Sequence, residues 1–229
     1  MTALPTDIAA CAFDAYGTLI DFNAAARRAP NLPGTQADAL ATLWRSRQLE
    51  YTWLRTLIGR YADFWHLTGE ALDEAMAELG ISNPALRAHL MELMLQPGAF
   101  PDAVEAVAAA RRSGLRTAVL SNANAAMLAS AIDGAGLRPH VDVLLSADTV
   151  GLYKPHPAVY RALCDRLDLE PPRILFVSGN DWDVAGAICF GLRGVWVNRN
   201  RRRPSRLAAM AMTELPSLTD LSTLLGSRS

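Results

Sequence analysis

Five short hydrophobic runs recur along the chain, separated by longer segments that mix hydrophobic and polar residues. β-Branched residues are frequent in these runs, and polar or turn-forming residues bound them. Continuous runs of this kind are typical of strands that are buried on both faces, as in a parallel sheet. The strands predicted in this way span residues 8–13, 117–121, 141–146, 174–178 and 194–198.

Helical patterns lie between these runs. Residues 103–113 have hydrophobic positions at helical spacing and end at Gly114, and residues 157–167 begin with Pro157, which suits the first turn of a helix. Strand and helix therefore alternate over the second half of the chain. This alternation predicts an α/β core built on a parallel sheet.

The interval between the first two predicted strands departs from this rhythm, because residues 22–97 hold no convincing strand and are too long for one crossover. Four large hydrophobic residues spaced seven apart predict a single helical stripe over residues 37–67. They are Trp44, Tyr51, Ile58 and Trp65. Gly59 is expected to bend or break that helix, at a cost of about 1 kcal/mol relative to alanine.

Two more amphipathic helices are predicted at residues 70–79 and 84–95, and a turn containing proline and glycine at residues 96–98 marks the return to the core. The interval therefore reads as an inserted helical cap. The predicted organisation is a core of residues 1–21 and 98–229 with a cap of residues 22–97.

Composition excludes some classes of partner. The 229 residues are 51% hydrophobic, enough for a sizeable core, and the formal net charge is -1 with a pI near 6.4. This balance creates no field that would attract nucleic acid or an anionic membrane, and no stretch reaches the roughly 18 apolar residues of a membrane span. We expect a small-molecule partner, no nucleic acid and no membrane.

The cysteines point to a reducing compartment. Cys11, Cys164 and Cys189 are odd in number and lie in hydrophobic segments, which is typical of small core residues rather than of disulfides. Residues 1–7 carry no basic residue ahead of the first hydrophobic run, unlike a secretory signal. We therefore expect a cytoplasmic protein.

Polar residues gather where the predicted strands end, which is where open parallel sheets bind ligands. They are Asp14 and Thr18 after the first strand, Ser121 and Asn122 after the second, Lys154 and Tyr160 after the third, and Ser178, Asn180 and Asp183 after the fourth. Each residue taken alone has an ordinary interpretation as a cap, a turn residue or a surface charge. Their joint occurrence at successive strand ends favours a functional site. The basic segment at residues 199–206 is predicted to be a solvated surface turn without function.

These strand-end segments resemble the four motifs of the haloacid dehalogenase superfamily, and within it the L-2-haloacid dehalogenases. The resemblance spans almost the whole chain and is most specific at residues 8–19, 43–55 and 176–186. It implies a Rossmann-like parallel sheet core with an inserted helical cap. It also implies a hydrolase that acts on carbon–halide bonds.

Two positions separate a dehalogenase from the superfamily's phosphatases. A phosphatase expels an alkoxide that needs a proton, and its substrate's charge usually requires Mg²⁺. Phosphatases of the superfamily accordingly carry the pattern Asp-x-Asp at the first motif and place metal-binding acids at the fourth. This chain has Tyr16 and Gly179 at those positions. We therefore expect no metal and no cofactor.

The resemblance implies a reaction in two steps. Asp14 needs no partner base to become nucleophilic, so it attacks the C2 carbon of a 2-haloacid and forms an ester with inversion. Lys154 favours and orients that carboxylate, and Arg45 with Asn122 captures the halide. Water then hydrolyses the ester, activated by Asp183 with Asn180, although Asp181 is close enough in sequence to remain an alternative. The product is a D-2-hydroxy acid.

The remaining predicted site residues bind or orient these groups. Ser121, with backbone amides after Asp14, is expected to hold the substrate carboxylate, and Tyr160 belongs to the surrounding shell. Thr18 and Ser178 are expected to orient Asp14 and Lys154 through hydrogen bonds. The wall around the alkyl group and the halogen is predicted to consist of Tyr16, Leu49, Phe64 and Trp182.

Several alternatives stay open at this stage. A Mg-dependent phosphatase of the same superfamily would show turnover that a chelator abolishes, and a catalytically silent binding protein would turn over no haloacid. Ser46, Gly179 and the Ala123–Asn124 pair depart from the dehalogenase pattern and leave chain-length and halogen preference open, including fluoride. The resemblance also implies a homodimer formed through cap helices.

Overall fold

The computed structural model describes residues 7–22, 32, 34–95, 98–203, 205–206 and 213–226. Residues 1–6, most of the predicted turn at 96–98 and Pro204 of the basic segment lie outside the described residues. None of the helices in the described part of the chain is long and apolar enough to cross a bilayer.

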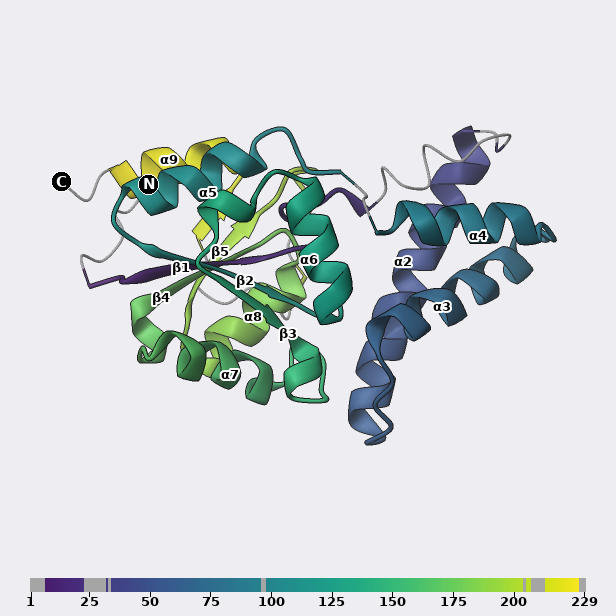
Figure 1. Ribbon diagram of the computed structural model, residues 1–229, viewed down its shortest axis with the longest axis horizontal. Helices are drawn as coiled ribbons and strands as arrows, with labels where there is room; N and C mark the ends of the chain where they lie inside the picture. Colours follow the sequence, from purple (N-terminus) through teal and green to yellow (C-terminus); the bar gives the residue numbers. More distant parts are fainter. Residues whose placement is uncertain are drawn as a thin grey trace.

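The core is a six-stranded sheet in the order β3-β2-β1-β4-β5-β6, and all neighbouring strands run parallel (Figure 1). The strands are β1 (Ala10–Asp14), β2 (Arg116–Ser121), β3 (Val143–Ser146), β4 (Ile174–Ser178), β5 (Arg193–Val197) and β6 (Thr213–Leu215). The five predicted strands are confirmed to within two residues at each end. β6 was not predicted, because three residues with only one buried side chain leave no hydrophobic run to detect.

Helices cover both faces of the sheet: α5 and α9 lie on one face, and α7 and α8 lie on the other (Figure 1). The core helices are α5 (Ala103–Arg112), α6 (Ala125–Gly134), α7 (Pro157–Leu167), α8 (Asp181–Phe190) and α9 (Thr219–Gly226). Short 3-10 turns occur at Arg138–His140, Ala147–Thr149 and Pro171–Arg173. This arrangement confirms the predicted α/β class.

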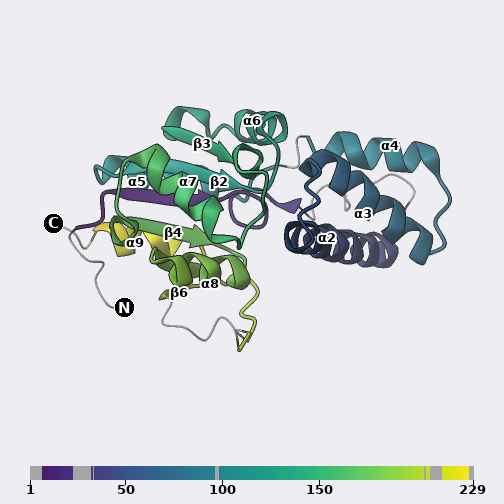
Figure 2. The same cartoon turned by 90° about the horizontal axis from the view of Figure 1, so that it is seen from below.

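Helices in the described part of the chain between β1 and β2 form a separate layer beyond the carboxyl ends of the strands (Figures 1 and 2). They are α2 (Gly34–Leu57), α3 (Phe64–Glu78) and α4 (Pro84–Leu93). Trp44 anchors α2 to α3, because its indole Nε1 donates a hydrogen bond of 2.8 Å to the carbonyl of Thr68. The chain therefore places a helical layer over the end of the sheet where ligands bind.

The single stripe predicted over residues 37–67 is wrong, because the helix stops before its end. Gly59 has a φ of +66°, a conformation that a helix cannot continue, and Asp63 then caps a new helix by accepting from the amide of Trp65 at 2.9 Å. Trp65 consequently lies on α3, and Ile58 is 66% exposed. The predicted break at Gly59 is confirmed.

The cysteine prediction holds for two of the three residues. Cys11 and Cys164 are buried, but Cys189 near the end of α8 is exposed. Its hydrophobic neighbours misled the interpretation, because α8 is hydrophobic on more than one side and its last turn reaches the surface.

Candidate active site

The sheet order brings the predicted site residues together. β1 lies between β2 and β4, so the ends of these three strands place Asp14, Ser121 and Ser178 at one edge. All three side chains are buried. Neighbouring parallel strands thus supply one polar cluster from residues that are up to 164 positions apart in the sequence.

Asp14 is 5% exposed, and both of its carboxylate oxygens accept hydrogen bonds. Oδ1 accepts from Lys154 Nζ at 2.7 Å. Oδ2 accepts from Thr18 Oγ1 at 2.8 Å, from Asn180 Nδ2 at 2.9 Å and from Ser178 Oγ at 3.3 Å. The two oxygens are therefore unequal, since Oδ2 is surrounded by donors and Oδ1 has one.

Lys154 lies between two buried carboxylates. Its ammonium Nζ donates to Asp14 Oδ1 and to Asp183 Oδ2, both at 2.7 Å, and to the carbonyl of Leu120 at 3.1 Å. Burial alone would lower the pKa of Lys154, but Asp14 and Asp183 raise it above its ordinary value. The lysine therefore stays charged and neutralises part of the carboxylate pair.

Asp183 is fully buried behind Lys154. Its Oδ1 accepts from the hydroxyl of Tyr160 at 2.7 Å, and its Oδ2 accepts from Ser178 Oγ at 3.2 Å as well as from Lys154. Burial raises the pKa of Asp183 to about 6, opposed by the charge of Lys154. A carboxylate with this pKa can accept a proton near neutral pH.

Asp181 lies outside this network. Its Oδ1 accepts from the amide of Trp182 at 3.0 Å and its Oδ2 accepts from the amide of Ser205 at 3.2 Å. These bonds hold the carboxylate at the start of α8 and toward the segment after β5. The geometry therefore favours Asp183 over Asp181 as the group that serves Asp14.

One predicted contact is wrong. Ser178 was expected to help orient Lys154, but its hydroxyl points to the carboxylates of Asp14 and Asp183. Its Oγ also accepts from the amide of Asn180 at 3.1 Å. Lys154 and Ser178 both donate to the carboxylates of Asp14 and Asp183, so these shared acceptors connect the two side chains.

Gly179 has no room for a side chain. A Cβ atom at this position would lie 2.3 Å from the carbonyl oxygen of Gly17, in the loop that follows Asp14. The amide of Gly179 donates to Thr18 Oγ1 at 2.7 Å, which orients the hydroxyl that bonds Asp14. A carboxylate at position 179 would therefore require the loop after Asp14 to move.

Arg45 reaches the site from the cap. Its Nη1 donates to Gln48 Oε1 at 2.7 Å and its Nη2 donates to the backbone oxygen of Tyr16 at 3.3 Å, while the guanidinium lies 5.1 Å from the ring of Phe22. Burial lowers the pKa of Arg45, and the charge of Asp14 opposes that effect. Among the described residues it forms no ion pair with a carboxylate, so this cation is available to an anion.

Gln48 was not singled out from the sequence. It is fully buried and donates from Nε2 to Thr68 Oγ1 at 2.7 Å while accepting from Arg45. It therefore fixes the arginine against α3. The available signal was a polar residue one helical turn after Arg45, a spacing shared by many exposed residues.

Arg199 contradicts the prediction of a solvated basic turn. Its guanidinium makes two hydrogen bonds to Asp102, of 2.7 and 2.8 Å, and a third of 3.0 Å to the backbone oxygen of Thr18. It also lies 4.1 Å from the ring centre of Phe100. Arg199 thus braces the loop that carries Thr18, a role that the surrounding basic residues concealed.

A small cavity lies between the core cluster and the cap, with a free volume of about 10 Å³, close to the space of one water molecule. Core and cap both contribute to its lining. The lining residues are Asp14, Tyr16, Arg45, Leu49, Phe64, Ser121, Asn122, Lys154, Asn180 and Trp182. The predicted wall residues therefore all surround it, whereas Asp183 and Tyr160 lie behind the lining.

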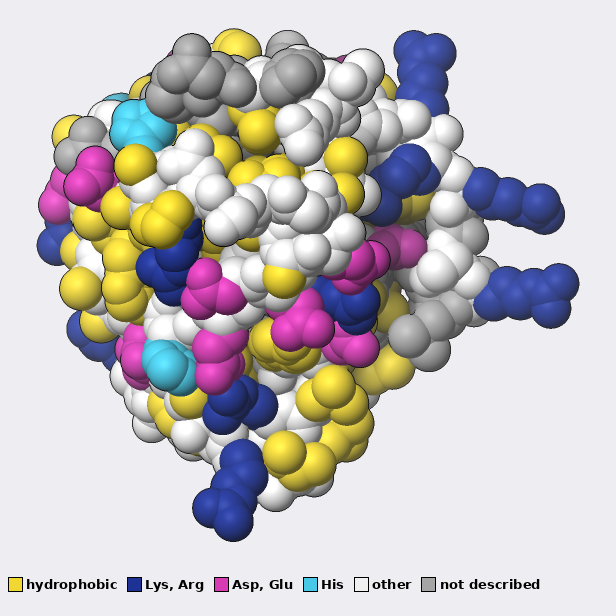
Figure 3. Space-filling model, turned by 90° about the vertical axis from the view of Figure 1, so that its right-hand side faces the viewer, with side chains coloured by type: hydrophobic (Ala, Val, Ile, Leu, Met, Phe, Trp, Pro, Cys, Tyr) yellow, Lys and Arg dark blue, Asp and Glu magenta, His cyan; other side chains and the backbone are white. Residues whose placement is uncertain are grey.

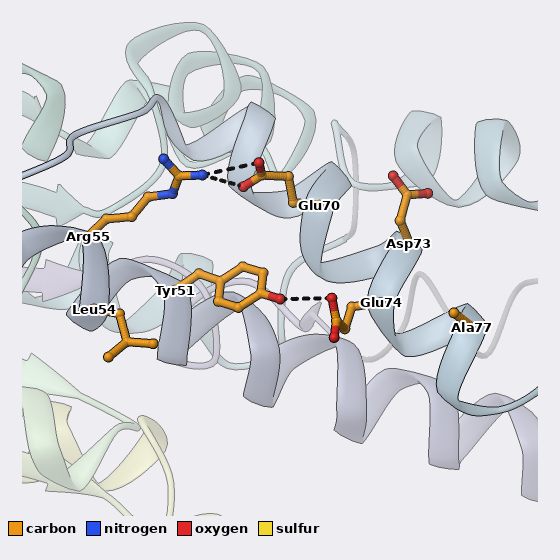
Figure 4. Close-up of a pocket in the computed structure, with 7 residues that line it drawn as sticks. All are labelled: Tyr51, Leu54, Arg55, Glu70, Asp73, Glu74 and Ala77. Carbon is orange, nitrogen blue, oxygen red and sulfur yellow. Dashed lines mark hydrogen bonds and ion pairs between the residues drawn. The ribbon is translucent and has the colours of Figure 1, made fainter.

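A larger hollow of about 640 Å³ lies elsewhere, on the outside of the cap between α2 and α3 (Figure 4). Its polar side chains pair with one another: Arg55 donates to Glu70 at 2.8 Å, and the hydroxyl of Tyr51 donates to Glu74 at 3.0 Å. Asp73 is paired with Arg87. This hollow offers no nucleophile with an adjacent activating group, so the chemistry belongs to the buried cluster.

Known proteins share both this sequence and this fold. A family model for haloacid dehalogenase-like hydrolases matches residues 8–191. (S)-2-Haloacid dehalogenase 1 of Pseudomonas sp. strain CBS-3 is 44% identical over 218 residues, which cover 92% of this chain and 96% of that protein. A crystal structure of a dehalogenase has a TM-score of 0.92 at 41% identity and covers 96% of this chain and 98% of that one.

A further structure bears on the chemistry. It is that of the L-2-haloacid dehalogenase from Xanthobacter autotrophicus with chloropropionic acid covalently bound, with a TM-score of 0.88 at 32% identity, covering 97% of this chain and all of that one (100%). The family resemblance inferred from the motifs is thus confirmed. The chain belongs to the haloacid dehalogenase-like hydrolases and, within them, to the family of (S)-2-haloacid dehalogenases.

Proposed function

We propose that this protein hydrolyses the carbon–halogen bond of short L-2-haloalkanoic acids and releases D-2-hydroxy acids and halide. One observation carries the proposal. The buried carboxylate of Asp14, bonded to Lys154, borders a small cavity that Arg45 lines from the cap, a cation without a carboxylate partner among the described residues. A nucleophile and an anion acceptor in the lining of one cavity are what displacement of a halide requires.

In the first step, a lone pair of Asp14 attacks C2 of the substrate from the side opposite the halogen. The new bond joins the carboxylate oxygen to C2, and the electron pair of the carbon–halogen bond leaves with the halide. We assign the attack to Oδ1, because among the described residues its donor is Lys154, whereas Thr18, Asn180 and Ser178 all surround Oδ2. Arg45, assisted by Asn122, receives the halide, which departs without a proton.

The cavity selects the substrate. Ser121 and backbone amides after Asp14 bind its carboxylate, and the side chains of Leu49, Phe64 and Trp182 enclose its alkyl group. Since the free volume is only about 10 Å³, binding requires adjustment of these walls even for a small acid. We therefore propose two- and three-carbon acids as the preferred substrates.

In the second step, water attacks the ester carbonyl of Asp14 and gives a proton to Asp183. The negative charge that develops on Oδ2 lies beside the donors of Thr18 and Asn180, which stabilise the tetrahedral intermediate. The bond from the carboxyl carbon to the substrate oxygen then breaks, and that oxygen takes up the proton. The C2 centre is untouched, so its inverted configuration is retained in the product.

We also propose that the reaction needs no metal ion. The ammonium of Lys154 already bridges the two buried carboxylates, with both distances at 2.7 Å, and so supplies the positive charge there. Within the described residues, no group of three or more His, Cys, Asp or Glu side chains is arranged to hold a metal ion. Gly179, with its Cβ position against Gly17, leaves no space for a further acid.

The test is incubation with each enantiomer of 2-chloropropionate, with and without EDTA, followed by chloride release and by the chirality of the lactate. We expect release from the L enantiomer, formation of D-lactate and equal rates with EDTA. Turnover of a generic phosphoester that EDTA abolishes would support the Mg-dependent phosphatase, and chloride release insensitive to EDTA would eliminate it. Absence of turnover with either enantiomer and with the phosphoester would support a binding protein.

We propose a homodimer whose contact includes the end of α2. Leu57 and Ile58 are 81% and 66% exposed there, and Leu54 adds to the same surface. Figure 3 shows hydrophobic side chains gathered between charged ones on the side of the molecule where the cap lies. Sedimentation equilibrium of the wild type and of Leu57→Glu tests this, since the variant is expected to be monomeric.

Two further predictions complete the proposal. The helices of the inserted segment, α2 to α4, act as a cap of residues 22–97 over a core of residues 1–21 and 98–229. The protein works in the cytoplasm, consistent with the buried cysteines Cys11 and Cys164.

A further inference from the structure

The hydroxyl of Tyr16 is buried and lacks a hydrogen-bond partner among the described residues. The side chain is 3% exposed and borders the cavity beside Asp14. Buried hydroxyl groups are nearly always paired, because leaving one unpaired costs its full desolvation. The hydroxyl is therefore expected to find its partner in a ligand.

The backbone of Tyr16 is held on two sides. Its carbonyl oxygen accepts from Arg45 Nη2 at 3.3 Å and from Asn180 Nδ2 at 3.2 Å. Residue 16 also forms an isolated bridge with Ile20. The backbone that carries the ring is thus held by Arg45 from the cap and by Asn180 from the core.

Tyr16 keeps its proton and lies near a positive charge. Burial raises the pKa of the phenol well above its ordinary value, and the nearby charge of Arg45 opposes that effect. The hydroxyl is consequently a donor throughout the physiological range. A donor next to an arginine that lacks a carboxylate partner forms a site for an anion.

Besides Arg45 and Asn122, to which the proposed function already assigns the halide, most other cavity groups are less suited to receive it. Leu49, Phe64 and Trp182 offer hydrophobic surface, while Lys154 and Asn180 already donate to Asp14. The halogen of a bound substrate must lie on the far side of C2 from Asp14, since the carboxylate attacks C2 opposite the carbon–halogen bond. That places it toward the side of the cavity to which Arg45 belongs.

We propose that the Tyr16 hydroxyl donates a hydrogen bond to the departing halide beside Arg45, which makes Tyr16 a catalytic residue of the displacement step. This inference rests on the proposed dehalogenation. The O–H bond stays intact: the halide leaves with the electron pair of the carbon–halogen bond, and the tyrosine stabilises its growing charge without transferring a proton.

The proposal predicts a dependence on the halogen. Hydrogen bonds to a small, concentrated anion are stronger than those to a large, diffuse one, so the contribution of the hydroxyl increases from iodide through bromide to chloride. A hydroxyl that bound the substrate carboxylate, or that only filled space, would affect all three substrates equally. The halogen series therefore distinguishes these roles.

The experiment compares wild type with Tyr16→Phe in single turnovers of L-2-iodo-, L-2-bromo- and L-2-chloropropionate, measuring halide release. We expect the variant to be about 10- to 100-fold slower with the chloro substrate, as for loss of a hydrogen bond to a charged group, and to approach the wild-type rate with the iodo substrate. Tyr51→Phe, which removes a hydroxyl on the outside of the cap, is the matched control and should leave every rate unchanged.

Two outcomes would overturn the proposal. An equal reduction for all three halogens would mean that the hydroxyl does not contact the halide. A lower melting temperature for Tyr16→Phe would reveal a structural partner, because removing an unpaired buried hydroxyl should preserve or raise stability. If the wild type released halide from none of the three substrates, the proposed function itself would fail, which the wild-type rates alone reveal.

Discussion

The two sides of the active-site cavity differ in how firmly they are held. On the core side, Asp14, Lys154 and Asp183 are almost fully buried and joined by hydrogen bonds of 2.7 Å. On the cap side, Arg45 is held by one bond of 2.7 Å and one of 3.3 Å, and Leu49 offers only contact surface. The core thus presents a preorganised carboxylate, and the cap presents an adaptable wall.

This difference assigns separate tasks to the two sides. Bond making and breaking need groups fixed within fractions of an ångström, which a network of buried hydrogen bonds provides. Substrate selection and halide capture tolerate looser groups. Substitutions in the core should therefore affect the chemical steps severely, and substitutions in the cap should have graded effects.

The largest effect is expected from Lys154→Met, which removes the cation between the two buried carboxylates. Breaking a buried ion pair in this way typically costs about 3–5 kcal/mol of unfolding free energy, and halide release should fall below detection. Urea denaturation and chloride assays measure the two effects. The control Arg87→Gln breaks the exposed ion pair with Asp73 and should lower the free energy of unfolding by no more than about 1 kcal/mol. A similar loss of unfolding free energy in both variants would contradict the contrast between the buried core network and the cap.

Asp183→Asn is expected to separate the two chemical steps. Asp14 remains able to form the ester, but loss of the proton acceptor should slow ester hydrolysis by about 10²- to 10⁴-fold. Rapid-quench chloride measurements should then show a burst equal to the number of active sites, followed by slow turnover. Asp181→Asn is the matched control and should turn over like the wild type, because Asp181 bonds to the backbone amides of Trp182 and Ser205 and, among the described residues, to none of the groups around Asp14.

A smaller effect is expected on the cap side at Gln48. Gln48→Glu keeps the shape of the side chain but gives Arg45 a carboxylate partner that competes with the halide. We expect the rate of halide release to fall about 10-fold, which is the scale of one charge-assisted hydrogen bond. Gln48→Met removes the contact without adding charge and should have a milder effect. Equal rates for the two variants would show that Arg45 does not serve as the anion acceptor.

The smallest effect concerns the pH profile. Because burial raises the pKa of Asp183 to about 6, ester hydrolysis should decline as the pH falls through that value and the carboxylate becomes protonated. Stability has the opposite sign: a raised carboxyl pKa contributes stability that is present below the ordinary value near 3.8 and is lost as the pH rises through about 6. The pH at the midpoint of the rate profile should be the same in Gln48→Met as in the wild type. A shifted midpoint in that variant would show that the cap side and the core side of the cavity are coupled.

The residues at the strand ends were predictable from the sequence, and contacts between distant segments were not. Asp14, Ser121 and Ser178 follow buried strands, and parallel strands must deliver their ends to one edge, so local patterns sufficed. Gln48 became significant only through its packing against Thr68 on another helix, which no local spacing reveals. Arg199 was hidden in a run of arginines because its partner Asp102 is almost a hundred residues earlier.

The wrong prediction of a single helical stripe over residues 37–67 has a similar cause. The seven-residue spacing from Trp44 to Trp65 fits one helix, yet these residues belong to two helices, α2 and α3, and Gly59 lies in the connection between them. Sequence spacing records periodicity but does not record where the chain reverses. The glycine was a local sign of that reversal, and it indicated the correct position.

The central claim is that Asp14 forms an ester with the substrate, and isotope transfer tests it most directly. A single turnover with excess enzyme in H₂¹⁸O, followed by mass spectrometry of the peptide that contains Asp14 and of the product, reports which atom water attacks. The account predicts ¹⁸O in the carboxylate of Asp14 and unlabelled D-lactate from L-2-chloropropionate. Label in the lactate with none in Asp14 would mean that water displaces the halide directly, which would contradict the account.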